Sequence, residues 1–220
     1  MNIVVFSPHA DDETLGAGGT LLKHHLQGDR IFGVNVTDVK EEYGYSKEAV
    51  EKSRKELAMV SQEYHMEKFY NLKLEPAGLN TCNVRELIQC FSEIMNEIKP
   101  QVVILPFPYD IHTDHHCVFE AVHACTKAFR YPFIEKILCM EIISETDYAL
   151  PNRGFVPNYF VDISNTIEKK VEIMKLYKSE IKDSPFPRNE KAVRGLAKFR
   201  AAACNVEYAE AFWLLKQIEK

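Results

Sequence analysis

Residues that interrupt regular structure are scarce in this 220-residue chain, which contains 9 glycines and 10 prolines. Collagen-like and low-complexity chains are rich in one or both, so the composition excludes those classes. Long hydrophobic runs are also missing, and no apolar stretch approaches the roughly 18 residues that a membrane-spanning helix needs. Because 46% of the residues are hydrophobic and 27% are charged, we expect a globular protein with a single domain, residues 1–220.

The chain also lacks concentrated positive charge. Its net charge is −5, its pI is near 5.9, and no run of Lys and Arg is longer than two residues. We therefore expect no nucleic-acid partner, since binding by charge alone needs a basic patch.

Signs of export are absent as well. The apolar residues 3–6 have no basic segment before them, and charged residues follow at once, which is unlike a signal peptide. None of the six cysteines belongs to a Cys-x-x-Cys pair. We expect a cytoplasmic protein in which these cysteines are reduced and act as small apolar residues.

Short apolar runs alternate with segments of helical periodicity along most of the chain. This pattern predicts an α/β protein, a Rossmann-like three-layer sandwich in which helices flank a mainly parallel sheet. The predicted strands are 3–6, 31–37, 69–72, 102–105, 137–143 and 159–163. The predicted helices are about 15–28, 46–65, 83–98 and 114–129, with two more that begin near 165 and 188.

Two polar segments follow the two most apolar short strands. In an open α/β sheet, ligands bind beyond the carboxyl ends of the strands, near the point where the strand order reverses. The segments 7–13 and 108–116 occupy such positions after the strands 3–6 and 102–105, and both are rich in His and Asp. They are the predicted functional loops.

The first loop places His9 close to the adjacent residues Asp11 and Asp12, just past a buried strand. Acidic residues at a helix start have a simpler explanation, because they cap free N–H groups. Capping does not explain His9, nor two neighbouring carboxylates that raise each other's pKa. A divalent cation explains both.

The second loop runs into a helix whose apolar stripe occupies positions 118, 122, 125 and 129. Three residues before this stripe lies His115, which we predict to point inward. His116 and His123 fall on the polar face and are predicted to be solvated. His112 precedes the helix and is free to face the same cleft as His115.

His9, one of the two aspartates and His115 make a two-histidine, one-carboxylate set with a position open to water. Such a set suits zinc and also Fe(II), so the residue types leave the metal open. A metal of this kind lowers the pKa of a water molecule and polarises a carbonyl. The remaining aspartate is then a general base, and His112 a donor to the oxyanion or an acid for the leaving group. The predicted chemistry is metal-assisted acyl hydrolysis.

The two loops resemble those of a known family. The segments SPHADDETLGAGG (7–19) and DIHTDH (110–115) look like the paired motifs of the LmbE-like, or PIG-L, zinc-dependent N-acetylglucosaminyl deacetylases. Similarity at 54–57, at 161–164 with Lys170 following, and at 208–212 extends the resemblance over nearly the whole chain. It implies a hydrolase that removes the acetyl group from an N-acetylglucosamine-type sugar or conjugate and releases acetate and a free amine. Ala10 and Thr113 stand where the family usually has proline, and we expect this to affect loop stiffness rather than chemistry.

The resemblance also implies roles for individual residues. It implies three zinc ligands, with Fe²⁺ as the alternative metal: His9, Asp12 and His115. It makes Asp11 the base and His112 the group that stabilises the tetrahedral intermediate, with Asp114 beside His112 to set its tautomer and charge. Arg54 matches an arginine that reaches into the sugar pocket, although it is also explained as a surface residue paired with a nearby glutamate.

Two other classes of protein remain as alternatives. One is a catalytically silent metal- or sugar-binding module, and the other is a nucleotide-binding Rossmann protein, suggested by the small residues 16–19. The pattern G-x-G-x-x-G requires glycine where Leu21 stands, which disfavours the nucleotide site. The expected partner is a small-molecule amino sugar, with no membrane span, and the resemblance implies a homo-oligomer. The segment 40–45, with Tyr43 and Tyr45 around Gly44, is predicted to be a lid that sets specificity.

Overall fold

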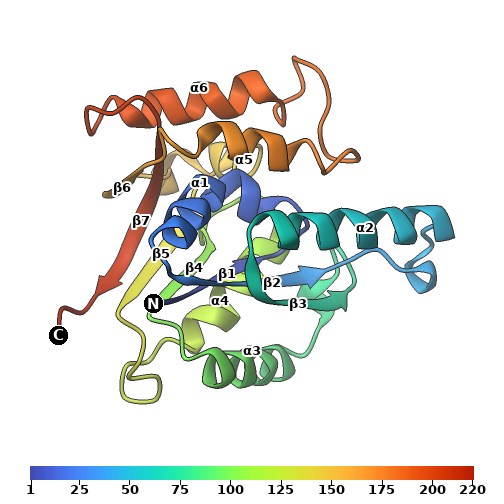
Figure 1. Cartoon of the computed structure of the whole chain (residues 1–220). Helices are drawn as coiled ribbons and strands as arrows, with labels where there is room; N and C mark the ends of the chain where they lie inside the picture. Colours follow the sequence, from blue (N-terminus) through green and yellow to red (C-terminus); the bar gives the residue numbers. More distant parts are fainter.

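The computed structural model describes residues 1–220 and contains one seven-stranded sheet, with the strand order β3-β2-β1-β4-β5-β7-β6 (Figure 1). Neighbouring strands from β3 to β5 pair in parallel, whereas β7 is antiparallel to both β5 and β6. The strands are β1 Asn2–Ser7, β2 Arg30–Thr37, β3 Met66–Leu74, β4 Val102–Pro106, β5 Lys136–Met140, β6 Tyr159–Asp162 and β7 Ala209–Gln217. The predicted sandwich with a mainly parallel sheet is confirmed.

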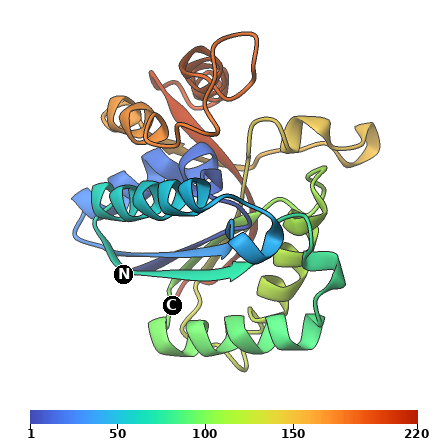
Figure 2. The ribbon, with the colours of Figure 1, turned by 90° about the vertical axis from the view of Figure 1, so that its right-hand side faces the viewer.

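Six α-helices cover the two faces of this sheet. They are α1 Asp12–Leu26, α2 Lys47–Glu63, α3 Val84–Ile98, α4 Thr113–Ala124, α5 Ile167–Met174 and α6 Glu190–Ala201. Figures 1 and 2 show α1, α2, α5 and α6 on one side of the sheet and α3 and α4 on the other. No helix is long and apolar enough to cross a membrane.

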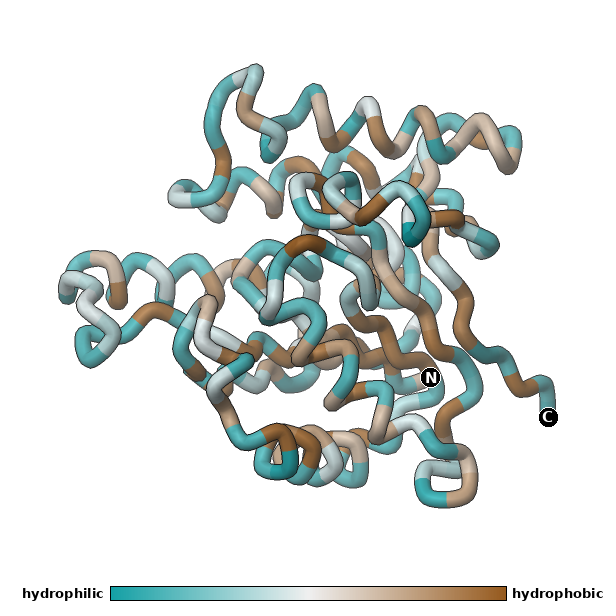
Figure 3. The backbone as a smooth tube through the Cα atoms, turned by 180° about the vertical axis from the view of Figure 1, so that it is seen from behind, coloured by the Kyte–Doolittle hydropathy of each residue, from teal (hydrophilic) through white to brown (hydrophobic).

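The apolar strands create two cores, one on each face of the sheet. In β1, Ile3 and Val5 join the core under α1, α2, α5 and α6, while Val4 and Phe6 join the core under α3 and α4. Successive side chains of a strand point to opposite faces, so a strand buried on both sides must be apolar throughout. In Figure 3, the segments in the middle of the molecule are accordingly coloured brown, for hydrophobic.

Two helices begin where the sequence predicts, at 46 and 83, and both starts are capped by side chains. Ser46 accepts a hydrogen bond from the backbone N–H of Ala49, and Asn83 accepts one from Arg85. Such caps satisfy N–H groups that have no partner inside the helix.

The glycines of α1 allow a close approach between this helix and its neighbours. A Cβ added at Gly16 would lie 2.8 Å from the side chain of Met140, and one at Gly19 would lie 2.7 Å from Ile163. Close packing thus accounts for the small residues that suggested a nucleotide site.

The structure differs from the sequence predictions about this fold in several details. Helix α4 ends at Ala124 rather than near 129, because the N–H groups of Cys125 and Thr126 bond carbonyls three residues back and close the last turn. Phe129, assigned to the inward stripe, is consequently 80% exposed. Strand β7 was not predicted, since its burial depends on antiparallel pairing with β5 and β6. His116 is half-buried and bonds the carbonyl of Asp110 instead of pointing into solvent.

Candidate metal centre and active site

The two predicted loops meet at the carboxyl ends of β1 and β4. These strands are neighbours, with β2 and β3 beyond β1 and β5 beyond β4, so the strand order reverses between them. This reversal is the place where open α/β sheets bind ligands. Helix α1 begins in the first loop and helix α4 begins in the second.

The backbone at the start of α1 is strained at Asp11. Its φ of 104° lies in the left-handed region, which side chains other than glycine rarely adopt. Such strain costs about 1–3 kcal/mol and persists where the surroundings enforce it, commonly at functional sites. Here the carbonyl of Asp11 accepts the N–H groups of Thr14 and Leu15, and its side chain is fully buried.

Three side-chain atoms from the two loops converge on one point. His115 Nε2 lies 3.4 Å from His9 Nδ1 and 3.4 Å from Asp12 Oδ2, and His9 Nδ1 lies 3.5 Å from Asp12 Oδ2. Tetrahedral ligands at about 2.1 Å from a zinc ion are separated by about 3.4 Å. The three separations therefore suit a metal ion better than they suit direct hydrogen bonds.

Carboxylates behind the two histidines orient their free nitrogens toward this point. His9 Nε2 donates to Asp114 Oδ2 at 2.9 Å, and His115 Nδ1 donates to Asp110 Oδ2 at 2.8 Å. In a neutral ring, donation by one nitrogen leaves a lone pair on the other. Both lone pairs then face Asp12, as metal ligands backed by carboxylates do.

A second group of metal-binding residue types, His9, His112 and Asp114, lies alongside the first. Its carboxylate is already used, because Asp114 accepts hydrogen bonds from His9 and from the backbone N–H groups of Ala77 and Leu79. Asp12 of the first group has more acceptor capacity left, since its Oδ2 accepts only the hydrogen bond from the backbone N–H of His9, at 2.8 Å, and its buried Oδ1 has no hydrogen-bond partner. An unpaired buried polar atom costs about 1–3 kcal/mol, so the first group is the one that fits a missing cation.

The pKa shifts of Asp12, His9 and His115 also favour the first group as the cation site. Burial alone would raise the pKa of Asp12, but the neighbouring His115 holds it well below its usual range. Burial disfavours the charged form of both histidines, yet Asp114 and Asp12 raise the pKa of His9 to about 9. Burial also lowers the pKa of His115, but Asp12 and Asp110 outweigh it and raise this pKa to about 10. Without a metal, the cluster thus takes up protons to supply the positive charge that its carboxylates require.

His112 lies beside His9, with the ring planes at 70° and the ring centroids 4.4 Å apart. Its Nδ1 accepts the backbone N–H of Asp114 at 3.1 Å, so the proton of the neutral ring sits on Nε2. Burial and the nearby His9 lower the pKa of His112, which favours this neutral donor form. The carboxylate of Asp114 lies 4.0 Å from His112 Nδ1 and makes its short contact with His9. The backbone of Asp114, rather than its carboxylate, orients His112.

Asp11 is paired with an arginine far away in the sequence. Arg188 Nη1 donates to Asp11 Oδ2 at 2.9 Å, while Oδ1 of the same carboxylate is buried without a partner. Burial raises the pKa of Asp11 well above its usual range, and the charge of Arg188 opposes this effect. A carboxyl group with a raised pKa is suited to general base catalysis near neutral pH.

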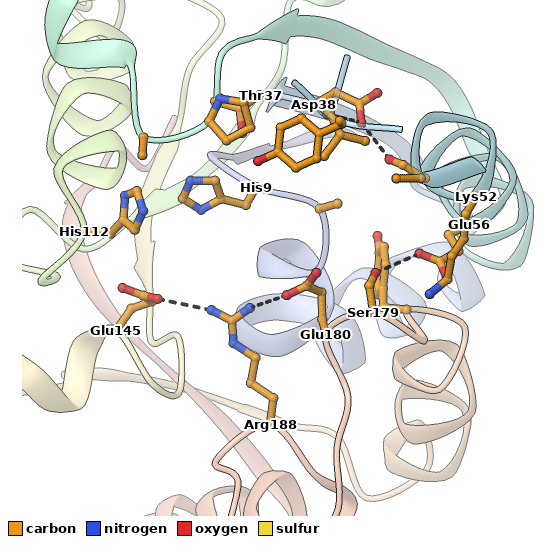
Figure 4. A pocket seen from close by; sticks show the side chains of 18 residues that line it. His9, Thr37, Asp38, Lys52, Glu56, His112, Glu145, Ser179, Glu180 and Arg188 are labelled. Carbon is orange, nitrogen blue, oxygen red and sulfur yellow. Dashed lines mark hydrogen bonds and ion pairs between the residues drawn. The ribbon is translucent and has the colours of Figure 1, made fainter. Parts of the chain in front are cut away.

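A cavity of about 460 Å³ opens above the cluster (Figure 4). His9, His112 and Arg188 line it, and the fully buried Asp11, Asp12 and His115 lie beneath. Tyr45 of the predicted lid also lines the cavity.

Arg54 is exposed and does not line this cavity. The face of α2 toward the cavity carries residues at helical spacing, namely Ala49, Lys52, Ser53 and Glu56. Sequence reasoning also missed that Asp110 accepts a hydrogen bond from His115 and that Asp38 accepts one from Ser53 at the edge of the cavity. Asp110 lies in the second predicted loop, five residues before His115, and this position could have indicated that it contacts the histidine.

The fold and this site together define an α/β protein with a two-histidine, one-carboxylate cluster at the switch point of a parallel sheet. The sequence profile of the family described as PIG-L, GlcNAc-PI de-N-acetylase, matches residues 4–126. This is more than half of the chain, and the protein belongs to that family.

Individual proteins are similar over nearly the whole chain. Diacetylchitobiose deacetylase from Thermococcus kodakarensis is 24% identical over 94% of this chain and 80% of its own length. The structure of N,N'-diacetylchitobiose deacetylase from Pyrococcus horikoshii has a TM-score of 0.76 at 24% identity, covering 98% of this chain and 84% of its own. The structure of a 4-carboxy-2-hydroxymuconate hydratase from Pseudomonas putida KT2440 has a TM-score of 0.74 at 14% identity, covering 100% and 98%. Because the fold also occurs in a hydratase, the reaction must be argued from the site.

Proposed function

We propose that this protein is a zinc-dependent N-deacetylase that hydrolyses the acetamide of an N-acetylglucosamine-type sugar or conjugate. The observation that carries the proposal is the convergence of His9 Nδ1, Asp12 Oδ2 and His115 Nε2 at 3.4–3.5 Å below a cavity lined by His112. Family membership and the similarity to diacetylchitobiose deacetylases support the choice of an amino sugar. Zinc is preferred to Fe²⁺ because the separations suit tetrahedral coordination.

When bound, the metal supplies a Lewis acid that polarises the acetamide carbonyl and lowers the pKa of water. Asp11 accepts the proton of the attacking water on Oδ1, the oxygen that Arg188 leaves free. Nε2–H of His112 donates to the oxygen that becomes negative in the tetrahedral intermediate. When the C–N bond breaks, Asp11 returns the proton to nitrogen, so that the products are acetate and an amine.

The proposal is tested by measuring acetate and free amine from N,N'-diacetylchitobiose and from other N-acetylglucosamine conjugates. We expect equal amounts of the two products, loss of activity after chelation and recovery with zinc. Asp11→Asn should retain zinc and lose turnover, whereas Asp147→Asn, which changes an exposed carboxylate outside the cavity, should leave both intact. Zinc binding without acetate release from any conjugate would instead identify a silent binding module.

The cytoplasmic location and the homo-oligomer stay predictions. The expected solution state is tested by light scattering at several protein concentrations.

A further inference from the structure

Carboxylates outnumber cations on the wall of the cavity. The ionisable Asp, Glu, Lys and Arg residues that line it are Asp38, Glu56, Glu145 and Glu180, against Lys52 and Arg188. Figure 4 shows Asp38, Lys52 and Glu56 at the end of the cavity away from His112. The acetamide reacts beside His112, so this distal end receives the part of the substrate beyond the acetamido sugar.

Both cations of the cavity lie beside carboxylates. Arg188 donates to Asp11 at 2.9 Å, to Glu145 at 3.1 Å and to Glu180 at 3.3 Å, so one guanidinium serves three carboxylates. Lys52 lies 3.8 Å from the buried Glu56. A phosphate or carboxylate bound at Arg188 would have to displace one of its three carboxylates, and one bound at Lys52 would lie close to the charge of Glu56.

Asp38 has no cationic partner. It lies just past the carboxyl end of β2 and accepts hydrogen bonds from the backbone N–H of Val39 at 2.8 Å, Ser53 Oγ at 2.6 Å and Asn71 Nδ2 at 2.6 Å. These neutral donors fix the carboxylate in place without balancing its charge. A carboxylate offers about four acceptor positions, so one remains for a ligand.

We propose, on the basis of the deacetylase function above, that this cavity selects substrates by the charge of the group beyond the acetamido sugar. A cationic group is preferred and an anionic group is rejected, with Asp38 as the residue that contacts the cation. The ligand class is an amino-sugar glycoside that carries an ammonium group, such as one whose second amino sugar is already deacetylated. The wall carries two more carboxylates than cations. Clefts lined by charge of one sign change ligand capture by about 10- to 1000-fold, and we expect the low end of this range for the partial excess here.

The test uses three glycosides of N-acetylglucosamine that differ only in charge: 2-aminoethyl, 2-hydroxyethyl and carboxymethyl. We expect kcat/KM for acetate release to fall in that order, with about 10-fold or more between the first and the last. Raising the salt from about 0.01 M to about 1 M should narrow the range, because the Debye length shrinks from about 30 Å to about 3 Å. Calorimetric Kd values of the same glycosides should follow the same order.

Asp38→Asn removes the charge and keeps the size of the side chain, and it should bring the aminoethyl and hydroxyethyl glycosides close to equal kcat/KM. Lys52→Gln should widen the gap between the cationic and anionic glycosides. Glu67→Gln is the matched control, because Glu67 is exposed and lies near the start of β3, at the opposite end of the strands. Glu67→Gln should leave the order of the three glycosides and the ratios of their kcat/KM values unchanged.

Equal kcat/KM for the three glycosides, or the fastest turnover with the carboxymethyl glycoside, would overturn the charge selection while the deacetylase function stands. A wild-type order that Asp38→Asn leaves unchanged would overturn the role of Asp38. If no glycoside releases acetate, the deacetylase function fails, and the Kd values still decide whether the cavity prefers cations. Absence of both turnover and binding rejects the two proposals together.

Discussion

Replacing Asp110 with alanine removes the acceptor that holds His115 in place. The Nδ1–H of His115 donates to Asp110 Oδ2 at 2.8 Å, and both side chains are buried. Thr146 Oγ1 donates to Asp110 Oδ1 at 2.6 Å, so the carboxylate itself is fixed. In Asp110→Ala, the ring of His115 is free to turn, and its other nitrogen is no longer aimed at His9 and Asp12.

Loss of a carboxylate behind a metal-binding histidine typically weakens metal affinity by about 10- to 100-fold. This corresponds to about 1.4–2.7 kcal/mol, since each tenfold change is about 1.4 kcal/mol. Asp110→Asn keeps an oxygen that accepts from His115 but turns an amide group toward Thr146, so its loss of affinity should be smaller. The predicted order of zinc affinity is wild type, then Asp110→Asn, then Asp110→Ala.

Zinc affinity is measured by competition with a chromophoric chelator, and circular dichroism confirms that each variant is folded. Asp147→Asn serves as the control, because it removes an exposed charge next to Thr146 without touching the site. A folded Asp110→Ala protein that binds zinc as tightly as wild type would refute this account of how His115 is oriented.

Three further predictions concern His112, the protonation of the metal cluster and the buried pair Lys170–Glu210. His112→Ala should keep its zinc and lose about 10²- to 10³-fold in kcat, as for a lost oxyanion donor; a variant without zinc would make His112 a ligand instead. Zinc binding at pH 7 should release about two protons, because the pKa values of His9 (about 9) and His115 (about 10) lie above this pH in the metal-free protein. Calorimetry in buffers of different ionisation enthalpy measures the number, which should fall toward zero above pH 10. Lys170→Met should destabilise the protein by about 3–5 kcal/mol, measured by urea unfolding, because it leaves the buried Glu210 without its ion pair at 2.7 Å. An unchanged free energy of unfolding would contradict the stabilising role of the Lys170–Glu210 ion pair.

That His9 and His115 come together beside the two aspartates could be predicted because each half of this group is local in the sequence, whereas the choice of Asp12 rested on the family resemblance. His9 and Asp12 are three residues apart after one apolar strand, and His115 heads a helix after another. Parallel strands bring such loops to the same edge of the sheet, so the pattern of strands implied the contact.

The partners of Asp11 and the distal wall of the cavity could not be predicted in this way. Arg188 lies 177 residues beyond Asp11 and reaches it from the segment before α6. The orientation of α2 decides that Lys52 lines the cavity and that Arg54 is exposed, and periodicity alone does not fix this. Lys170 and Glu210 belong to the later segments that resemble the family. They form an ion pair with each other and hydrogen bonds with the backbone of α1. The role of these segments is therefore to hold α1 in position.

Anomalous diffraction at the zinc edge, from crystals of the zinc-loaded protein, tests the central claim most directly. We predict one strong peak at about 2.0–2.2 Å from each of His9 Nδ1, Asp12 Oδ2 and His115 Nε2. A peak held by His112 and Asp114, or one without Asp12 among its ligands, would contradict the account.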